Sequence, residues 1–330
     1  MKTRTGEARA TKQPKARARV LVVVKTSSYE AYVARRRDPR TLELLAKKDP
    51  SVSRMMASHT AHEATVGEVF ESLAELGASA TSVTTTTLGD SSPDDFDLVV
   101  TIGGDGTLLT TSHGVGVGTP LLGINSAPDH SVGFFCAARG GRSGEVRKAL
   151  SAAFTERMRR TVVSRMEVAV NDGYLSRRVL NDALFCHEVP AATSRYILTV
   201  ASRGPASARS RSRPPSQEEE QKSSGLWIGP AAGSTAAQKS AGGRILPLTS
   251  RQIQYVVREP YTPTGGHLSL ARGVVGEGGT VTLRSKMRQG KLFLDGPHVV
   301  HDVGLGDVVT LRLSAEPLTV LGLTRRAASV

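Results

Sequence analysis

Cysteine and aromatic residues are scarce in this chain of 330 residues. Only Cys136 and Cys186 occur, far apart and outside any CxxC pair. Two isolated thiols argue against a disulfide framework or a cysteine zinc site, and they fit a reducing compartment. Aromatic residues make up 4% of the chain, whereas glycine occurs 33 times. This balance favours a loop-rich architecture of α/β or β type.

Long apolar runs are also absent. No stretch approaches the ~20 apolar residues that a membrane-spanning helix needs. Residues 1–19 are basic and polar and lack the apolar centre of a secretory signal, although their composition leaves a mitochondrial-type transit peptide open. We therefore expect a cytoplasmic protein with no membrane partner.

The signatures of nucleic-acid binding are missing, although the formal net charge is +13. The chain shows no helix-turn-helix, zinc-finger or RNA-binding aromatic pattern. Much of the positive excess lies in 1–18 and 203–222, whose low-complexity composition predicts disorder. We expect no nucleic-acid partner, and a smaller share of the charge could attract polyanionic nucleotides.

Several catalytic patterns are missing as well. Neither the P-loop pattern GxxxxGK[ST] nor the nucleophile elbow GxSxG occurs. The pairs His59/His62 and His298/His301 are spaced i, i+3, but neither has the third ligand or the glutamate of a zinc enzyme. No residue is therefore assigned as a metal ligand.

The first half of the chain alternates short apolar runs with stretches of helical spacing. The strand candidates are Val20–Val24, 79–85, Asp97–Ile102 and Pro120–Asn125, and the helix candidates are 52–76 and 143–154. This βαβ alternation predicts an α/β fold with a doubly wound, Rossmann-like sheet over 19–157, completed by 314–330. Such sheets bind ligands at the carboxyl ends of their strands.

After about residue 160, short strand candidates follow one another without helices. Asn171-Asp172-Gly173 between two such runs is a strong hairpin signal. The pattern predicts an antiparallel, all-β, sandwich-like domain over 158–313, with a disordered insertion at 203–222. Residues 1–18 are expected to form a disordered basic arm.

The sequence Gly103-Gly104-Asp105-Gly106-Thr107 lies between a buried-strand pattern and a helical one. Glycines let the backbone approach a ligand closely, and the free N–H groups of a helix start attract phosphates. Asp105 conflicts with a phosphate unless it holds a metal or takes a proton. The alternative is an ordinary strand–turn–helix corner in which Asp105 caps the helix.

Three further stretches could join this turn in one cleft. They are Gly123–Ser126 leading to Gly133-Phe134-Phe135, Leu180-Asn181-Asp182-Ala183, and Gly233–Gly243. An amide beside a carboxylate can bind ribose hydroxyls and an amide together. The small side chains of the last stretch let a planar ligand approach the backbone. Each stretch alone also fits a strand end, a turn or a helix cap.

Together and in this order, the four stretches resemble the NAD kinase family. The GGDGT turn is shared with diacylglycerol kinase-like lipid kinases and, loosely, with phosphofructokinases. The Asn181-Asp182 pair and the Gly233–Gly243 stretch narrow the resemblance from this wider group of kinases to the NAD kinase family. Residues 221–226 (QKSSGL) and the strand with KTSSYE at 20–30 resemble the divergent, mitochondrial-type subgroup.

The resemblance implies that ATP phosphorylates the adenosine-ribose 2′-hydroxyl of NAD or NADH with a divalent metal, Mg²⁺. It implies an α/β nucleotide-binding domain, an all-β NAD-binding domain and a homodimer or homotetramer. Asp105 would be the general base. Phosphate contacts would come from Gly103, Gly104, Gly106 and Thr107. NAD contacts would come from Asp105, Gly106, Asn181, Asp182, Lys222, Ser224, Thr235, Ala236, Ala237 and Ser240.

The chain departs from the family pattern at four positions. Asp182 replaces the usual glutamate, Ala237 a base-stacking tyrosine, Ser224 an aspartate, and Pro297 a glutamine. Two alternatives therefore stay open, a lipid kinase that uses the same turn and a non-catalytic NAD(P)-binding regulator. The phosphoryl donor, ATP or polyphosphate, and the choice between NAD and NADH also stay open.

Overall fold

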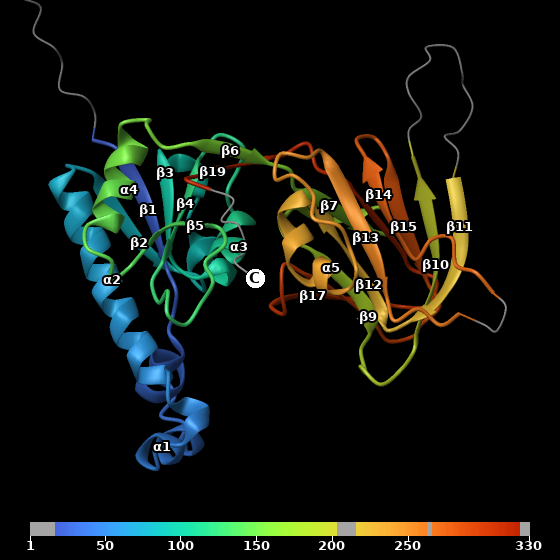
Figure 1. The fold of residues 1–330 in the computed structure, drawn as a ribbon, viewed down its shortest axis with the longest axis horizontal. Coiled ribbons are helices and arrows are strands. Elements are labelled where there is room, and N and C mark those ends of the chain that lie inside the picture. The colour runs from blue at the N-terminus through green and yellow to red at the C-terminus, as the bar shows by residue number, and fades with distance from the viewer. Residues whose placement is uncertain (1–16, 203–215, 263–265, 324–330) are drawn as a thin grey trace, which may run out of the picture.

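The computed structural model describes residues 17–202, 216–262 and 266–323. They form two domains side by side, the first blue to green and the second mainly yellow to red (Figure 1). Nearly all of the expected basic arm at 1–18, and residues 203–215 of the expected insertion, lie outside the described residues.

A mainly parallel sheet of seven strands forms the first domain. Its order is β2-β1-β3-β4-β19-β6, with β5 also paired to β4, and only β6 runs antiparallel to its neighbour. The strands are β1 Arg19–Val24, β2 Ser79–Thr84, β3 Leu98–Gly103, β4 Leu121–Asn125, β5 Cys136–Arg139, β6 Arg160–Val163 and β19 Leu318–Leu321. Strand β6, which the sequence assigned to the second domain, thus joins this sheet.

Helices cover both faces of this sheet. Val69 and Leu150, from α2 and α4, share one apolar cluster with Val22 of β1, whereas Leu108 of α3 packs with the opposite face. The helices are α1 Pro39–Ala46, α2 Met55–Glu75, α3 Asp105–Ser112 and α4 Glu145–Phe154. Short turns of π- or 3₁₀-helix cover Glu30–Arg35, Pro50–Val52, Leu88–Asp90 and Pro93–Asp95. The predicted doubly wound α/β class is confirmed.

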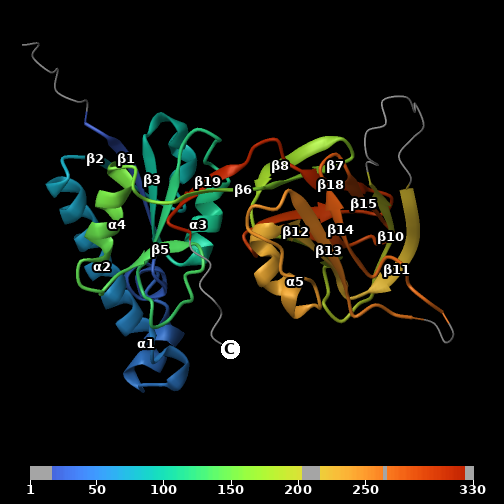
Figure 2. The same cartoon turned by 45° about the horizontal axis from the view of Figure 1, so that its top comes forward.

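The second domain contains two antiparallel sheets of six strands each (Figure 2). One sheet has the order β11-β10-β15-β18-β7-β8, with β7 Met166–Val170, β8 Gly173–Val179, β10 Ser194–Ala201, β11 Ser216–Ser223, β15 Thr280–Ser285 and β18 Val308–Leu313. The other has the order β14-β13-β12-β9-β16-β17, with β9 Ala183–His187, β12 Gly225–Pro230, β13 Gln252–Arg258, β14 Arg272–Gly276, β16 Gly290–Leu294 and β17 Val299–Val303. The 3₁₀ turn Ala231–Thr235 and α5 Ala237–Ser240 follow β12.

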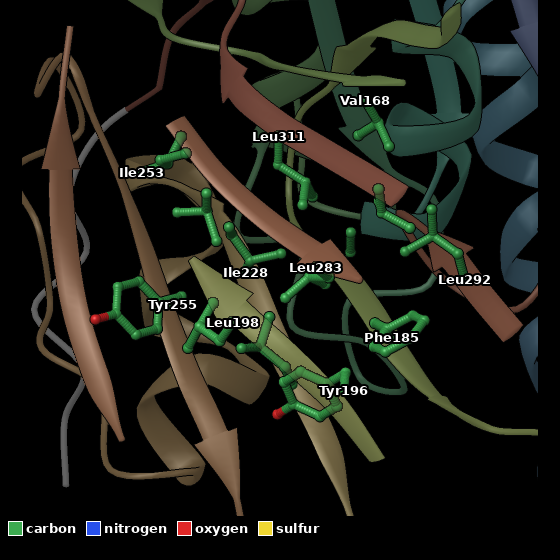
Figure 3. Close-up of a cluster of buried hydrophobic side chains, with 14 of the residues drawn as sticks. Val168, Phe185, Tyr196, Leu198, Ile228, Ile253, Tyr255, Leu283, Leu292 and Leu311 are labelled. Atoms are coloured by element: carbon green, nitrogen blue, oxygen red, sulfur yellow. The ribbon is translucent and has the colours of Figure 1, made fainter. Parts of the chain in front are cut away.

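One apolar core joins the two antiparallel sheets (Figure 3). Leu198, Leu283 and Leu311 come from one sheet, and Phe185 and Ile228 come from the other. The expected sandwich-like second domain is therefore confirmed. The predicted hairpin is present too, because Asn171 and Asp172 have φ of 49° and 66° between β7 and β8.

Residues 216–222 correct the prediction of a disordered insertion over 203–222, because they belong to strand β11. This strand lies at a sheet edge and, within the part of the chain that the structure describes, pairs with β10 alone. The run of glutamates suggested a loop because most strands contain apolar residues. An edge strand, however, tolerates polar side chains. Glu219 accepts hydrogen bonds from the N–H groups of Ser269 and Leu270, so the acidic side chains have structural partners.

Arg165 lies where the chain crosses between the domains, and its side chain is fully buried. Its guanidinium donates to the carbonyls of Ser112 and Val115 at 2.9 and 2.8 Å, and to that of Glu316 at 2.6 Å. The first carbonyl belongs to the last residue of α3, the second lies three residues after that helix, and the third lies on the returning segment before β19. Burial lowers the pKa of Arg165 to about 10, so the group stays charged at neutral pH. The guanidinium of Arg165 thus ties both segments that connect the domains, the one between β6 and β7 and the one between β18 and β19, to the region of α3.

Arg165→Met should lower the free energy of unfolding by roughly 3 kcal/mol, because it leaves buried carbonyls without donors. Urea denaturation followed by circular dichroism measures the change. Arg160→Met, an exposed arginine on β6, is the matched control and should alter stability by less than about 0.5 kcal/mol. Equal effects of the two substitutions would contradict the clamping role.

Candidate functional site

A cleft of about 840 Å³ lies between the two domains. The carboxyl ends of three parallel strands and the start of α3 form one wall, and the turn between β16 and β17 forms the other. The lining residues are Lys25, Thr26, Thr85, Thr86, Gly104, Asp105, Gly106, Thr107, Leu109, Thr110, Ser131, Val132, Asp295, Gly296, Pro297 and His298. The cleft occupies the sheet edge where doubly wound folds bind ligands.

The GGDGT turn connects β3 to α3 with Gly104 as the N-cap residue. A Cβ on Gly103 would lie 2.1 Å from Oγ1 of Thr107, so this position admits no side chain. A Cβ on Gly106 would meet no atom of the described chain within 4 Å. The fold therefore does not require glycine at 106, and the missing side chain leaves room in the cleft. Of the expected phosphate contacts, Gly103 is buried and does not line the cleft.

Asp105 is the first residue of α3, and its carboxylate makes no capping bond to the helix. Its two oxygens accept hydrogen bonds from the main-chain N–H groups of Phe134 and Phe135 at 2.9 and 2.8 Å. The capping alternative is therefore wrong. Each carboxylate oxygen can still accept a further hydrogen bond, and the group lies on the cleft wall.

The loop after β4 brings these two N–H groups to Asp105. Asn125 is buried, donates to the carbonyl of Ser131 at 3.0 Å and accepts from its hydroxyl at 2.8 Å. Gly133 has φ of 63°, and a Cβ there would lie 2.4 Å from the Asn125 amide nitrogen. The Gly123–Ser126 and Gly133–Phe135 stretches thus hold the loop in place without lining the cleft themselves, whereas Ser131 and Val132 between them line it.

Asp295 holds the Asn181-Asp182 pair in place. Its carboxylate, 2% exposed, accepts from the N–H groups of Leu180, Asn181 and Asp182 at 2.8, 2.6 and 3.0 Å. The same carboxylate lies 2.9 Å from Nε2 of His113, directly after α3. The pair itself does not line the cleft, but it is attached to a residue that does.

Asp182 is a buried carboxyl, and its Oδ2 accepts from the Asn181 amide at 2.7 Å. Burial, and secondly the nearby Asp295 carboxylate, raise the pKa of Asp182 to about 7. Its charge therefore changes near neutral pH, unlike that of an exposed aspartate.

The Gly233–Ser240 stretch packs against the same pair. A Cβ on Gly233 would lie 1.7 Å from the carbonyl oxygen of Asn181, so only glycine permits this contact. Thr235, Ala236, Ala237 and Ser240 lie beyond it on the partly or fully exposed side of the turn and of α5. The structure thus brings Asn181-Asp182 and Gly233–Ser240, two of the predicted NAD-binding stretches, into contact, although neither lines the cleft.

Lys222 and Ser224 lie elsewhere. Lys222 is exposed on β11, the edge strand far from α3 in Figure 1, and Ser224 lines a small separate pocket with Glu259 and Tyr261. The structure does not bring either residue to the cleft of Asp105. Their assignment as NAD contacts stays a prediction.

Sequence reasoning missed Asp295 and His113 as parts of the site. Asp295 has φ of 51° and precedes Gly296, also at positive φ, so the Asp-Gly pair was a readable turn signal between two strands. His113 carried no such signal, because only the tertiary fold brings it to Asp295.

The described residues contain no group of three or more histidine, cysteine, aspartate or glutamate side chains arranged to hold a metal ion. Within the same residues, no helix is long and apolar enough to cross a membrane.

Comparisons with known proteins agree with this arrangement. Residues 11–157 match the family model of the ATP-NAD kinase N-terminal domain. A probable NADH kinase of Oryza sativa subsp. japonica is 33% identical over 242 residues, which cover 69% of this chain and 71% of that protein. The mitochondrial NAD kinase 2 of Rattus norvegicus is 33% identical over 125 residues, which cover 36% of this chain and 29% of that protein. An NAD kinase from Archaeoglobus fulgidus, solved in complex with ATP, is 18% identical and covers 92% of both chains with a TM-score of 0.60.

The fold is thus that of a two-domain nucleotide kinase. The chain belongs to the NAD kinase family. The resemblance to the NAD kinase family stated from the sequence is confirmed, and a mitochondrial NAD kinase 2 is among the relatives.

Asp182→Asn should make the stability less dependent on pH. The raised pKa means that the folded protein keeps a proton that the unfolded chain releases between about pH 4 and 7. Wild-type stability therefore falls as pH rises through this window, by at most ~1.4 kcal/mol per pH unit from this group. An asparagine amide binds no such proton, so the variant should gain stability relative to wild type from pH 5 to pH 8.

Urea denaturation at pH 5, 6, 7 and 8 measures this trend. Asp172→Asn, at an exposed turn residue whose φ of 66° asparagine tolerates, is the matched control. If the stability difference between wild type and Asp182→Asn is constant with pH, the assigned protonation is wrong.

Proposed function

We propose that this protein is an NAD(H) kinase, which transfers a phosphoryl group from ATP to the adenosine-ribose 2′-hydroxyl of NAD or NADH. Family membership supports the reaction class, and the probable NADH kinase among the relatives supports the reduced cofactor as one acceptor. The position of Asp105 supports the mechanism most directly. A carboxylate fixed by two N–H groups stands at the start of a helix in the interdomain cleft.

In this mechanism, Asp105 accepts the proton of the 2′-hydroxyl while that oxygen attacks the terminal phosphorus and ADP leaves. Phosphoryl transfer depends mainly on positioning and on neutralising charge. The N–H groups of Phe134 and Phe135 hold the carboxylate still, so no reorganisation is needed when the hydroxyl arrives. Gly104, Gly106 and Thr107 provide the open backbone beside the phosphates.

The acceptor would lie toward the second domain. Asn181 and Asp182, held by Asp295, and Thr235 to Ser240 beside them, would bind the NAD portion. Lys222 and Ser224 would contact it only in another arrangement of chains, such as the expected homodimer or homotetramer. That assembly and the cytoplasmic location stay predictions.

Mg²⁺ would arrive with ATP. The cleft offers the carboxylates of Asp105 and Asp295, and each already accepts main-chain hydrogen bonds. Magnesium is commonly bound through one or two carboxylates together with substrate phosphates, so Asp105, whose oxygens can each accept a further bond, would fit a nucleotide-borne ion, whereas the buried Asp295 already accepts three main-chain hydrogen bonds. When bound, the ion offsets phosphate charge.

Product analysis tests the reaction itself. Purified protein is offered NAD or NADH with ATP or polyphosphate, and nucleotides are separated by chromatography. Formation of NADP or NADPH supports the proposal and identifies both the acceptor and the donor. Phosphorylation of diacylglycerol vesicles without any NADP(H) would favour the lipid kinase, and binding of NAD(P) without turnover would favour the regulator.

Asp105→Asn should lower kcat by roughly 10²–10⁴-fold, because the amide cannot accept the hydroxyl proton. A coupled assay of NADP(H) formation measures the rate, and calorimetry should show that NAD still binds. Asp90→Asn, at an exposed aspartate of the first domain, should retain wild-type activity. Full activity of Asp105→Asn would rule out its role as the base.

Gly106→Ala should separate stability from activity. The added methyl meets no protein atom in the folded state, and it lowers the conformational entropy of the unfolded chain. The free energy of unfolding should therefore rise by about 0.4–1 kcal/mol. The same methyl enters the cleft, so KM for nucleotide should rise at least about tenfold. Gly67→Ala in α2, which is equally free of contacts, should be stabilised without loss of activity. Loss of activity in both variants would contradict the prediction.

A further inference from the structure

A small polar chamber of about 120 Å³ adjoins the cleft and takes no part in the mechanism above. It shares Lys25, Gly104 and Ser131 with the cleft. Its other walls come from the segment after β1, the first two turns of α2 and the loop after β4, namely Ser27, Ser28, Met55, Ser58, His62, Ser126, Ala127 and His130. The volume has room for several waters or a phosphate group.

His62 contributes an unusual atom to this chamber. The residue is 3% exposed, and its Nδ1 lies 2.8 Å from the hydroxyl of Ser126. Its buried Nε2 has no hydrogen-bond partner of ordinary geometry among the described residues, although the main chain of Lys25, on the chamber wall, is close enough to interact with the ring. A buried ring nitrogen without such a partner is costly in a folded protein, which suggests a ligand.

The chemistry of the chamber favours an anion. When Ser126 donates to Nδ1, the ring proton is on Nε2, so this residue of the chamber wall offers a hydrogen-bond donor. Lys25 adds a positive charge, Ser28 and Ser58 add hydroxyl donors, and none of the lining residues is acidic. The N-terminal end of the 21-residue helix α2 also lies here, and its dipole favours negative charge.

We propose that this chamber binds the terminal phosphate groups of the phosphoryl donor, with Nε2 of His62 and Nζ of Lys25 as hydrogen-bond donors. The inference rests on the proposed function, because it names the part of the donor that enters from the cleft. The chamber meets the cleft at Gly104, the residue next to Asp105. The sequence presented His62 only as half of a weak histidine pair.

His62→Gln tests the proposal. The variant should raise KM for ATP about tenfold, the loss expected for one charge-assisted hydrogen bond, and leave KM for NADH within about twofold of wild type. Calorimetry with inorganic tripolyphosphate should show the same weakening. His301→Gln is the matched control, since His301 also has a buried Nε2 without a partner but lines neither the cleft nor the chamber.

The other outcomes are equally decisive. An unchanged KM for ATP and unchanged tripolyphosphate binding would overturn the proposal. If inorganic phosphate inhibits the His62→Gln variant more weakly than wild type while KM for ATP is unchanged, the chamber binds free phosphate. That result would overturn the assignment of the chamber to the phosphoryl donor. If wild type forms no NADP(H), the proposed function fails, whereas the tripolyphosphate titration still decides on the chamber.

A second variant keeps the test valid if His62→Gln does not fold, which thermal melting will show. Ser58→Glu places an acid in the first turn of α2, where the helix dipole tolerates it, and its charge should repel phosphates from the chamber. It should raise KM for ATP at least as much as His62→Gln does. Unchanged tripolyphosphate binding by this variant would overturn the proposal.

Discussion

The position of helix α3 between the two domains is the constraint on which the fold and the site both depend. Its first residue, Asp105, carries the carboxylate in the cleft. The carbonyl of its last residue, Ser112, and that of Val115 just beyond it accept hydrogen bonds from the buried guanidinium of Arg165. His113, directly after the helix, lies against Asp295 of the second domain. One short helix therefore positions the reactive group at one end and the second domain at the other.

The two carboxylates at the domain boundary have different tasks because they have different partners. Asp105 accepts from two main-chain N–H groups and faces the cleft, so it can still take a substrate hydroxyl. Asp295 is almost wholly buried and accepts from three N–H groups, so its role is to fix the backbone of residues 180–182. Its charge also raises the pKa of Asp182, so structural support and the protonation of a predicted binding residue are linked.

Local patterns predicted those parts of the fold that depend on local chemistry. The runs at Val20–Val24 and Pro120–Asn125 became strands β1 and β4, because burial on both faces of a parallel sheet selects apolar and β-branched residues there. Strand β11 was missed, since an edge strand needs little apolar character. The GGDGT turn was found by its glycines, whereas its link to Phe134 and Phe135 depends on a loop whose path the sequence does not specify.

The chamber beside the cleft shows why motif reading alone leaves part of such a site hidden. His62 lies on α2, Lys25 follows β1 and Ser126 follows β4, so segments about 100 residues apart supply its donors. They meet because parallel strands end at one edge of the sheet and α2 begins there. Gly104 borders both the chamber and the cleft, so terminal phosphates held in the chamber would lie beside the turn that carries Asp105. The same geometry that brings these residues together would thus direct the donor toward the base.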